Sequence, residues 1–486
     1  MGTDERDVRV GKLEEMRAMG IAPYRDRYER NKTLIEAKGL RVGTSGIRIV
    51  GRVMAVRKFG KLIFATLKDC SGTLQIALQE KSLDKKKFSI FKKYVDIGDF
   101  IGAEGTMFKT KLGEITLDIK QFDLLSKALR PLPEKWHGLQ ERELVYRQRY
   151  LDLVMNDGSF EKFIKRTRII KTMREYLDDH GFVEVETPVL QTKPSGAVAT
   201  PFVTHHSALD LDLYLRIAPE TYLKRCIAGG FEKVYEFARC FRNEGIDPSH
   251  LQDFTLLEWY AAFWNYRDNM RFTRDLIKHV VFTVNGSMSV SFGDKIIDFS
   301  GEWEQRSMRD IILRDTGIDI GMTSKADDLK KLLKSKGIEI EGAGQMGFGT
   351  LVDNLFKKLS RPEIDGPLFL IHHPIELSPL SRKNDEDQRL TDRFQVIVNG
   401  WEIVNAYSEL IDPLEQRKRF EEQAELKRKG DSETMTTDED FLTAMEYGMP
   451  PTSGLGLGVD RFAALLTNEE NLRDAILFPL MRPTEP

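Results

Sequence analysis

Cysteine is scarce in this sequence of 486 residues, which contains only Cys70, Cys226 and Cys240 and no CxxC pair. Three scattered cysteines cannot build a disulfide framework, so we expect a reducing, cytoplasmic environment. Long apolar runs are also missing, because none approaches the ~18–20 residues that a membrane-spanning helix needs. The first residues are charged from Asp4 onward, and we therefore expect no secretory signal.

Several common catalytic signatures are absent as well. The sequence has no GxxxxGKS/T phosphate loop, no HExxH metal motif and no GxSxG nucleophile elbow. The glycine cluster from Gly454 to Arg461 does not match the GxGxxG dinucleotide fingerprint. The histidine pairs 205–206 and 372–373 would point to opposite faces of a strand, which does not suit zinc. An enzyme with this sequence must therefore bind a nucleotide by other means.

Charge is divided unevenly along the chain, although the formal net charge is only −3. Residues 1–130 contain 27 Lys and Arg against 17 Asp and Glu, whereas residues 131–486 contain 46 against 59. Because Lys and Arg displace counterions from phosphates, the basic part could bind a nucleic acid. The acidic part could bind something cationic. Two solvated protein surfaces would give the same totals.

Short strands separated by glycine-containing turns fill residues 47–125. Five such strands with one short helix near residues 85–93 are typical of an OB-type barrel. These barrels often bind oligonucleotides, although a barrel without a ligand has the same pattern. Residues 4–19 have a helical pattern that ends at Gly20. We predict a helical N-terminal extension over residues 1–43 and an OB-fold domain over 44–130.

The rest of the sequence predicts one large domain. A proline-containing linker over residues 131–151 separates it from the barrel. Residues 159–179 have apolar positions at helical spacing, and His180-Gly181 ends this helix before a strand with the sequence FVEVETPVL. Strands and helices continue to the C-terminus, so we predict an α+β domain over 152–486, with a helical insertion at about 300–360.

Three segments carry the most specific pattern. They are the helix and strand over about residues 159–188, the string VYEFARCFRNEGIDPSHLQDFTLLEWY over 234–260, and GMPPTSGLGLGVDRFAALL over 448–466. In this order they resemble motifs 1, 2 and 3 of the class II aminoacyl-tRNA synthetases of subclass IIb. The strings LDLYLRIAPETYLKR, EIVNAYSEL and LFPLMRP resemble the lysyl-tRNA synthetase family in particular. The resemblance covers about residues 45–486.

The resemblance implies a fold, an activity and partners. The implied fold is an OB-fold anticodon-binding domain followed by a class II catalytic domain, in which helices flank an antiparallel sheet. The implied enzyme is a lysine–tRNA ligase. It would convert L-lysine and ATP into lysyl-adenylate and pyrophosphate, and then transfer lysine to the 3′-terminal adenosine of lysine tRNA. Mg²⁺ is the implied cofactor, and a two-fold homodimer built on motif 1 is the implied assembly.

Adenylate formation depends on positioning and on charge neutralisation, and the arginine fork suits both carboxylate and phosphate oxygens. By resemblance, the catalytic residues are Arg242, between the lysine carboxylate and the α-phosphate, and Arg461, beside the γ-phosphate and the adenine. Phe254 would stack on the other side of the adenine ring. The full set implied for ATP is Arg242, Glu244, His250, Phe254, Glu402 and Arg461.

A buried ammonium group must be paired with carboxylates, because its desolvation is otherwise too unfavourable. The resemblance assigns Glu258, Tyr260 and Glu409 to the lysine ε-ammonium group. It assigns Glu220 and the Gly196 backbone to the α-ammonium group. Such a pocket would repel an aspartate side chain, which favours lysine as substrate. The full set implied for lysine is Gly196, Glu220, Arg242, Glu258, Tyr260, Asn405 and Glu409.

The sequence departs from the family pattern at a metal-binding position, in motif 2, and at Thr200, where the family usually has Arg or Lys. The resemblance implies two metal-binding positions, and Glu402 fills one of them, but the other holds Gln395 in the string RFQ where the family usually has RFE. An amide oxygen is a weaker ligand for Mg²⁺ than a carboxylate. The family commonly has HNPEF in motif 2, whereas this chain has HLQDF. Leu251 therefore stands in place of a hydrogen-bonding asparagine.

For the barrel, the resemblance implies four anticodon-reading residues: Arg57, Phe64, Gln75 and Glu114. Phe64 could stack on a base, and the other three could bond base edges. Two alternative functions stay open. One is a paralogue that forms lysyl-adenylate but acylates a protein or a small acceptor, which the four barrel residues argue against. The other is a non-catalytic RNA-binding protein, which predicts loss of Arg242 or Arg461, and both are present.

Overall fold

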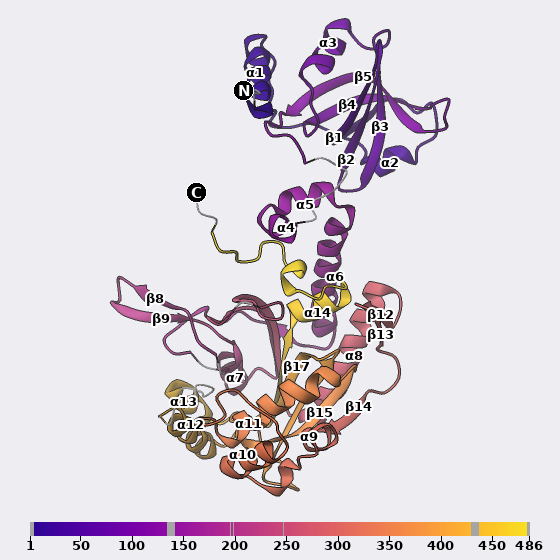
Figure 1. The fold of residues 1–486 in the computed structure, drawn as a ribbon. Coiled ribbons are helices and arrows are strands. Elements are labelled where there is room, and N and C mark those ends of the chain that lie inside the picture. The colour runs from indigo at the N-terminus through magenta and orange to yellow at the C-terminus, as the bar shows by residue number, and fades with distance from the viewer. Residues whose placement is uncertain are drawn as a thin grey trace. The chain divides into compact units, whose positions relative to one another are not determined.

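The computed structural model describes residues 4–133, 141–194, 196–197, 199–245, 247–428 and 437–483. The chain divides into two compact units, residues 1–139 and 140–486, and each is described by itself (Figure 1). Residues 134–140, in the middle of the predicted linker, lie outside the described residues. Among the helices that are described, none has the length and apolar character needed to cross a membrane.

The first unit is built on a closed five-stranded barrel, which confirms the predicted OB fold. Apolar and polar residues alternate along its strands. In β2, for example, Ile63 is buried in the barrel core while Phe64 lies half-buried on the outer face. The strands are β1 (Ile47–Phe59), β2 (Leu62–Asp69), β3 (Gly72–Gln79), β4 (Phe100–Lys109) and β5 (Ile115–Ser126), in the order β1-β2-β3-β5-β4; the helices are α1 (Glu5–Ala18), α2 (Leu34–Lys38) and α3 (Lys85–Tyr94).

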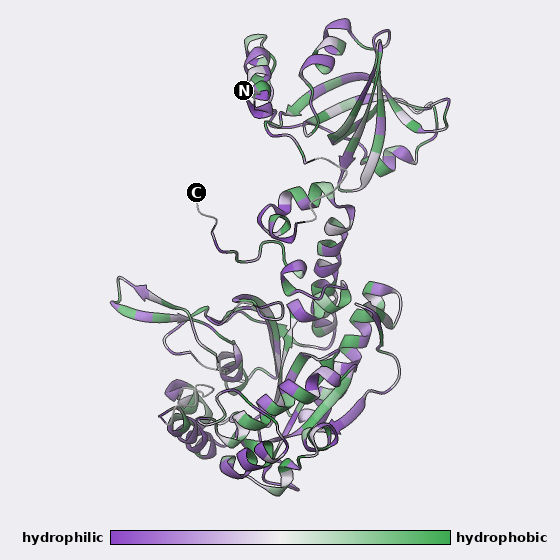
Figure 2. Cartoon of the chain, viewed as in Figure 1, coloured by the Kyte–Doolittle hydropathy of each residue, from purple (hydrophilic) through white to green (hydrophobic). Residues whose placement is uncertain are grey.

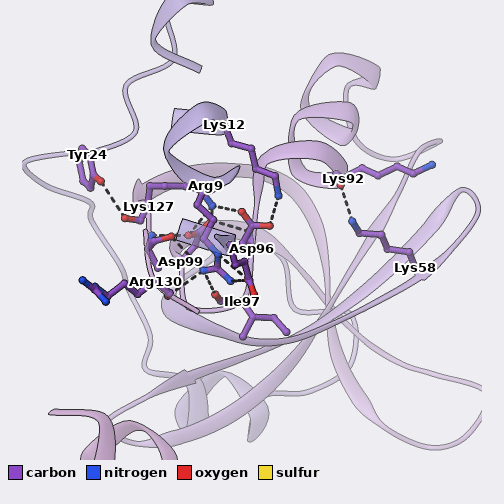
Figure 3. Close-up of polar contacts among 12 residues, drawn as sticks. Arg9, Lys12, Tyr24, Lys58, Lys92, Asp96, Ile97, Asp99, Lys127 and Arg130 are labelled. Atoms are coloured by element: carbon purple, nitrogen blue, oxygen red, sulfur yellow. Dashed lines mark hydrogen bonds and ion pairs between the residues drawn. The ribbon is translucent and has the colours of Figure 1, made fainter. Parts of the chain in front are cut away.

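A buried cluster of charged groups joins α1 to the barrel (Figure 3). Lys127 Nζ lies 2.6 Å from Asp96 Oδ2 and 2.9 Å from Asp99 Oδ2, and the Lys127 and Asp99 side chains are fully buried. Arg9 from α1 donates a hydrogen bond of 2.9 Å to the carbonyl oxygen of Ile97. An unpaired charge in this position would be strongly destabilising. The cluster therefore fixes α1 against the segment that leads into β4.

The second unit is built on an eight-stranded sheet in the order β14-β15-β16-β17-β18-β11-β10-β6. Neighbouring strands are antiparallel except at the two edges, where β14 pairs with β15 and β6 with β10 in parallel. The predicted antiparallel sheet is thus confirmed for its centre. The strands are β6 (Val183–Glu184), β10 (Lys233–Phe241), β11 (Asp253–Ala262), β14 (Glu304–Ser307), β15 (Leu368–Pro374), β16 (Leu390–Val398), β17 (Trp401–Ser408) and β18 (Thr452–Gly458).

Helices cover this sheet and bury its main core. The predicted helix over residues 159–179 is α6, and its Met173 packs with Leu276 of α8, Phe462 of α14 and Trp259 of β11. Figure 2 shows hydrophobic residues along the strands of the sheet, whereas α12 is mostly hydrophilic. The helices are α4 (Arg142–Arg147), α5 (Arg149–Met155), α6 (Asp157–Asp179), α7 (Glu220–Ala228), α8 (Tyr266–Asn285), α9 (Met308–Thr316), α10 (Ala326–Ser335), α11 (Phe348–Leu355), α12 (Pro413–Arg428), α13 (Glu439–Glu446) and α14 (Val459–Leu466).

Smaller elements complete the second unit. The predicted strand FVEVETPVL is divided between β6 in the main sheet and β7 in a separate three-stranded sheet. Between β14 and β15, helices α9 to α11 enclose a hydrophobic core of their own. The remaining elements are β7 (Leu190–Gln191), β8 (Val203–His206), β9 (Leu211–Leu215), β12 (Ser289–Phe292), β13 (Lys295–Asp298), η1 (Ile320–Met322), η2 (Phe356–Ser360), η3 (Arg361–Glu363), η4 (Ile375–Leu377) and η5 (Leu472–Ala475).

Candidate active site

One cavity of about 190 Å³, which is open to solvent, gathers most of the predicted site residues of the second unit. Strands β11, β17 and β18, the loop between β10 and β11, and the first turns of α7 and α14 supply most of its wall. Glu409 and Gln395 do not line the cavity themselves, but Glu409 lies beside Gly454 of the wall and Gln395 donates a hydrogen bond to Glu402 of the wall. The predicted residues on the wall are Gly196, Glu220, Arg242, Glu244, His250, Phe254, Glu258, Tyr260, Glu402, Asn405 and Arg461.

Glycines in β18 allow the side chains of neighbouring strands to meet across the sheet. Gly454 lies opposite Tyr260 of β11 and Tyr407 of β17 in the strand register. A Cβ atom on Gly454 would overlap the Tyr260 ring and the Glu409 carboxylate. At Gly456 the nearest atom to an added Cβ would be 3.7 Å away, an ordinary contact. Position 454 therefore requires glycine for steric reasons, whereas position 456 does not.

Carboxylates gather at one end of the cavity. The Glu220 and Glu258 side chains line it, and the Tyr260 hydroxyl donates a hydrogen bond of 3.2 Å to Glu258 Oε2. Behind the wall, Lys224 Nζ lies 2.6 Å from Glu220 Oε1 and 2.5 Å from Glu409 Oε2. Three carboxylates and one lysine thus lie together, and with all three carboxylates ionised the cluster has an excess of negative charge that suits a cationic ligand.

Burial shifts the protonation of this cluster. Burial and the nearby charge of Glu220 raise the pKa of Glu258 well above its ordinary value. Burial also raises the pKa of Glu409, although Lys224 opposes the shift. Burial alone would lower the pKa of Lys224, but Glu220 and Glu409 reverse that effect and raise it. Lys224 is therefore charged, whereas Glu258 binds a proton more tightly than an exposed glutamate does.

Arginine and aromatic side chains mark the other end of the cavity. The Arg242 guanidinium carbon lies 4.9 Å from the centre of the Phe254 ring, and its buried Nε has no hydrogen-bond partner among the described residues. Arg461 Nη1 donates a hydrogen bond of 3.0 Å to the carbonyl oxygen of Glu402. His250 Nδ1 lies 2.7 Å from Asp247 Oδ2. This end of the cavity therefore offers cationic and aromatic groups that suit a nucleotide.

Leu251, the departure in the second motif, has an apolar environment. Its side chain packs against a small hydrophobic cluster formed by Ala464, Leu472 and Ala475. Leu251 also lines the cavity, so that the wall is apolar where the resemblance expects asparagine. Contact between apolar groups replaces a side-chain hydrogen bond at this point.

The pair Gln395 and Glu402 decides which side chain can offer oxygen to a metal ion. Gln395 Nε2 donates a hydrogen bond of 2.6 Å to Glu402 Oε2. Because a carboxylate only accepts, this bond fixes the orientation of the amide and turns its oxygen toward His373 Nε2, 3.2 Å away. The Gln395 oxygen is thus already used. Glu402 fits as the one carboxylate ligand for an ion carried by phosphates, because no three His, Cys, Asp or Glu side chains among the described residues are placed to hold one metal ion together.

The four predicted residues of the first unit come from adjacent strands of the barrel. Arg57 of β1 lies opposite Phe64 of β2 in the strand register. Arg57 Nη2 donates a hydrogen bond of 3.3 Å to Gln75 Oε1, and Gln75 Nε2 donates one of 2.9 Å to Thr116 of β5. Glu114 stands immediately before β5, and its carbonyl oxygen accepts a hydrogen bond from Thr110. The structure thus places Arg57, Phe64 and Gln75 side by side on the outer face.

Comparison with known proteins agrees with this arrangement. The family of class II tRNA synthetases (D, K and N) matches residues 141–482, and an OB-fold nucleic acid binding domain matches residues 47–125. The lysine–tRNA ligase of Syntrophomonas wolfei is 45% identical over 480 residues, which cover 98% of this chain and 97% of that protein. The chain belongs to the lysine–tRNA ligase family. The ligase of Thermotoga maritima is 44% identical, and the match covers 98% of this chain and 96% of that protein. The ligase of Bacillus subtilis is 43% identical, and the match covers 99% of this chain and 97% of that protein.

Tyr407 and Lys224 contribute to the site of this lysine–tRNA ligase family member but were not predicted from the sequence. Tyr407 lines the cavity, and its hydroxyl donates a hydrogen bond of 2.5 Å to Glu220 Oε1. Its position two residues after Asn405 on one strand was a usable signal, because such residues share a face. Lys224 follows Glu220 by four residues on α7, a spacing that is equally typical of an exposed ion pair.

Proposed function

We propose that this chain is a lysine–tRNA ligase. It activates L-lysine with ATP to form lysyl-adenylate and pyrophosphate, and transfers lysine to the 3′-terminal adenosine of lysine tRNA. The observation that carries the proposal is a single cavity with carboxylates at one end and arginines at the other, in a chain of this family. The first end suits the ammonium groups of lysine, and the second suits a triphosphate.

The lysine-binding end has groups for each part of the amino acid. Glu258 with Tyr260 would bind the ε-ammonium group, and Glu409 would act from behind the wall. Glu220 would bind the α-ammonium group beside the Gly196 backbone. Asn405 accepts a hydrogen bond of 2.8 Å from Arg393 through Oδ1, so its NH₂ group remains to donate to the lysine carboxylate. The pocket would therefore bind lysine through charge at three points.

Arg242 lies where both substrates would meet. Its free Nε–H and its fork can contact the lysine carboxylate and the α-phosphate together. One carboxylate oxygen would then attack the α-phosphorus, the bond to the β-phosphate oxygen would break, and pyrophosphate would leave. Neutralising the charge on the phosphates accelerates such a step, because the protein forms no covalent bond itself.

The ATP-binding end is assembled from both sides of the cavity. Phe254 would stack on the adenine, and Glu244 and His250 of the second motif would contact the nucleotide. Arg461 would bind the terminal phosphate; burial lowers its pKa, yet arginine stays charged under any working condition. Mg²⁺ bound to the triphosphate would neutralise phosphate charge, and Glu402 is the side chain that fits it as a ligand.

The barrel and helix α6 suggest the macromolecular partners. Arg57, Phe64, Gln75 and Glu114 would read the anticodon of lysine tRNA. We infer a two-fold homodimer through α6 and the strands after it, which sedimentation analysis would test. The support is a set of exposed apolar residues in this region: Phe160, Ile164, Val183, Val189 and Leu190. The unpaired cysteines agree with a cytoplasmic location.

Lysine-dependent exchange of pyrophosphate into ATP, measured beside charging of lysine tRNA, tests the proposal. We expect both activities in the parent protein, neither in Arg242→Ala, and exchange without efficient charging in Phe64→Ala. Exchange without charging in the parent would instead indicate a protein that acylates another acceptor. If no exchange occurred at any Mg²⁺ concentration, the better interpretation would be a protein that binds RNA without catalysis.

A further inference from the structure

The hairpin between β1 and β2 presents an aromatic side chain to solvent. Phe59 is the last residue of β1, and 62% of its surface is exposed. Gly60, with φ +60°, makes the turn that follows. Since a phenylalanine side chain stabilises a fold through its burial, an exposed one at a hairpin tip contributes little to folding.

Phe59 belongs to the same outer face as the predicted anticodon-reading residues. Arg57 and Phe59 are two positions apart on one strand, so their side chains point the same way. Lys58 between them points elsewhere, because its Nζ donates a hydrogen bond of 2.8 Å to the carbonyl oxygen of Lys92 in α3 (Figure 3). Phe59 therefore extends the row that contains Arg57 and Phe64 toward the tip of the hairpin.

The rings of Phe59 and Phe64 are edge-to-face neighbours. Their centres are 6.4 Å apart and their planes differ by 71°. Two rings at this angle cannot stack on the two faces of one base, since that would require parallel planes. They can stack on two successive bases whose planes differ in the same way, as in a single-stranded loop of RNA.

A groove beside Phe59 carries positive charge. It is lined by Phe59, Lys61, Leu62, Gln79, Glu80, Lys81 and Lys85. Lys61 pairs with Glu80 at 3.4 Å, but Lys81 and Lys85 have no carboxylate within ion-pair distance among the described residues. An aromatic ring at one end and unpaired lysines along the wall match the two parts of a nucleotide, the base and the phosphate.

We propose that Phe59 and this groove bind the nucleotide next to the base that stacks on Phe64. Phe59 would stack on that additional base, and Lys81 and Lys85 would contact the phosphates beside it. The inference rests on the proposed function, because it requires the outer face of the barrel to bind the anticodon loop of lysine tRNA. It adds a contact outside the four predicted anticodon-reading residues.

Direct binding of a lysine tRNA transcript to the full-length protein tests this proposal without depending on catalysis. We expect Phe59→Ala to raise Kd about five- to tenfold, since one stacked base is lost, and Phe59→Trp to stay within about twofold. The matched control is Ile97→Ala, which truncates another exposed apolar residue of the same unit, 39% exposed, away from the groove. Pyrophosphate exchange, which needs no tRNA, should be unchanged in all three variants.

Two further arms separate stacking from charge. Replacing the two nucleotides on either side of the base that stacks on Phe64 with abasic ones, singly, should identify one position at which Phe59→Ala has no further effect. Lys81→Gln with Lys85→Gln should reduce the slope of log Kd against log salt by about 1.4, at about 0.7 for each of two phosphate contacts, whereas Phe59→Ala should leave the slope unchanged.

The proposal would be overturned if Phe59→Ala bound the tRNA as tightly as the parent protein. It would also be overturned if the loss of affinity in Phe59→Ala added in full to the loss from each of the two abasic substitutions. Failure of the proposed function would look different. In that case the parent protein would show no lysine-dependent exchange or no charging, while the binding data would still decide the role of Phe59.

Discussion

Gln395 Nε2 donates a hydrogen bond of 2.6 Å to Glu402 Oε2, and the Gln395 oxygen faces Nε2 of His373 at 3.2 Å. His373 is fully buried, and burial lowers its pKa well below the ordinary value, so it is neutral and donates from Nε2. A chain of neutral donors thus holds the Glu402 carboxylate in place. In this chain, position 395 therefore holds a residue that orients Glu402, the proposed metal ligand, in place of a second carboxylate.

Gln395→Glu is expected to increase the number of divalent ions that bind with the nucleotide. A second carboxylate so close to Glu402 repels it unless a cation lies between them. With a non-hydrolysable ATP analogue present, electron paramagnetic resonance should count more Mn²⁺ bound per subunit in the variant. Without divalent ions, the variant should unfold at a lower temperature than the parent.

Gln395→Leu is the matched control for that variant, since it removes the hydrogen bond and adds no charge. It should keep the Mn²⁺ count of the parent while exchange activity falls, because Glu402 is no longer oriented. An unchanged Mn²⁺ count in Gln395→Glu would show that position 395 does not face the ion.

Gly454→Ala is expected to destabilise the protein even without substrates. The new methyl group would overlap Tyr260 and Glu409, and overpacking of this kind typically costs about 1–3 kcal/mol. Gly456→Ala, two residues away on the same strand, meets its nearest atom at 3.7 Å and should change stability by less than about 0.5 kcal/mol. Urea denaturation of both proteins measures the difference, and equal free energies of unfolding would contradict the steric argument.

Lysine should bind more tightly as the pH rises. Burial and the charge of Glu220 raise the pKa of Glu258, so the empty site retains a proton above the ordinary glutamate range. The lysine ε-ammonium group needs the ionised carboxylate, and binding should therefore release protons. Calorimetry near pH 7 in buffers of different ionisation enthalpy should show net release, which Glu258→Gln should reduce. Proton uptake, or a Kd independent of pH between 6 and 8.5, would contradict this expectation.

The same carboxyl group links pH to the stability of the empty protein. A folded-state pKa above the unfolded value contributes stability that is complete below the unfolded pKa and is lost as the pH rises through the folded pKa. Glu258 should therefore make the protein without lysine less stable from about pH 4.5 upward, and saturating lysine should offset that loss. Thermal unfolding with and without lysine across this range gives the comparison.

Much of the site was predictable because its residues lie in short contiguous strings that match the family pattern, such as the one that contains Arg242, Phe254 and Glu258. The relationships between segments were not. The i, i+4 spacing of Glu220 and Lys224 does not distinguish an exposed pair from a buried one, and their partner Glu409 lies far along the chain. The sequence predicted that His372 and His373 point to opposite faces of a strand, but it gave no sign of the irregularity there. His372 has φ 56°, the strand register shifts beside it, and His373 contacts Gln395.

The barrel was predictable for a different reason. Alternating burial in β1 to β3 appears directly in the sequence as alternating apolar residues, and short turns leave few choices of pairing. The strand FVEVETPVL shows the limit of such patterns. Its apolar residues predict one continuous strand, yet only Val183–Glu184 and Leu190–Gln191 pair, and they do so in two different sheets. Tertiary partners, which a local pattern does not contain, decided the division.

The order of strands in the large sheet has a consequence for biosynthesis. β18 lies between β11 and β17, although it is translated nearly 200 residues after β11. Until residues 452–458 leave the ribosome, no hydrogen bonds can join the two halves of this sheet, and both inner edges stay open to wrong pairing. The substrate cavity can therefore form only after β18 has been translated. Premature termination anywhere before β18 yields a chain with two exposed sheet edges and no adenylating activity.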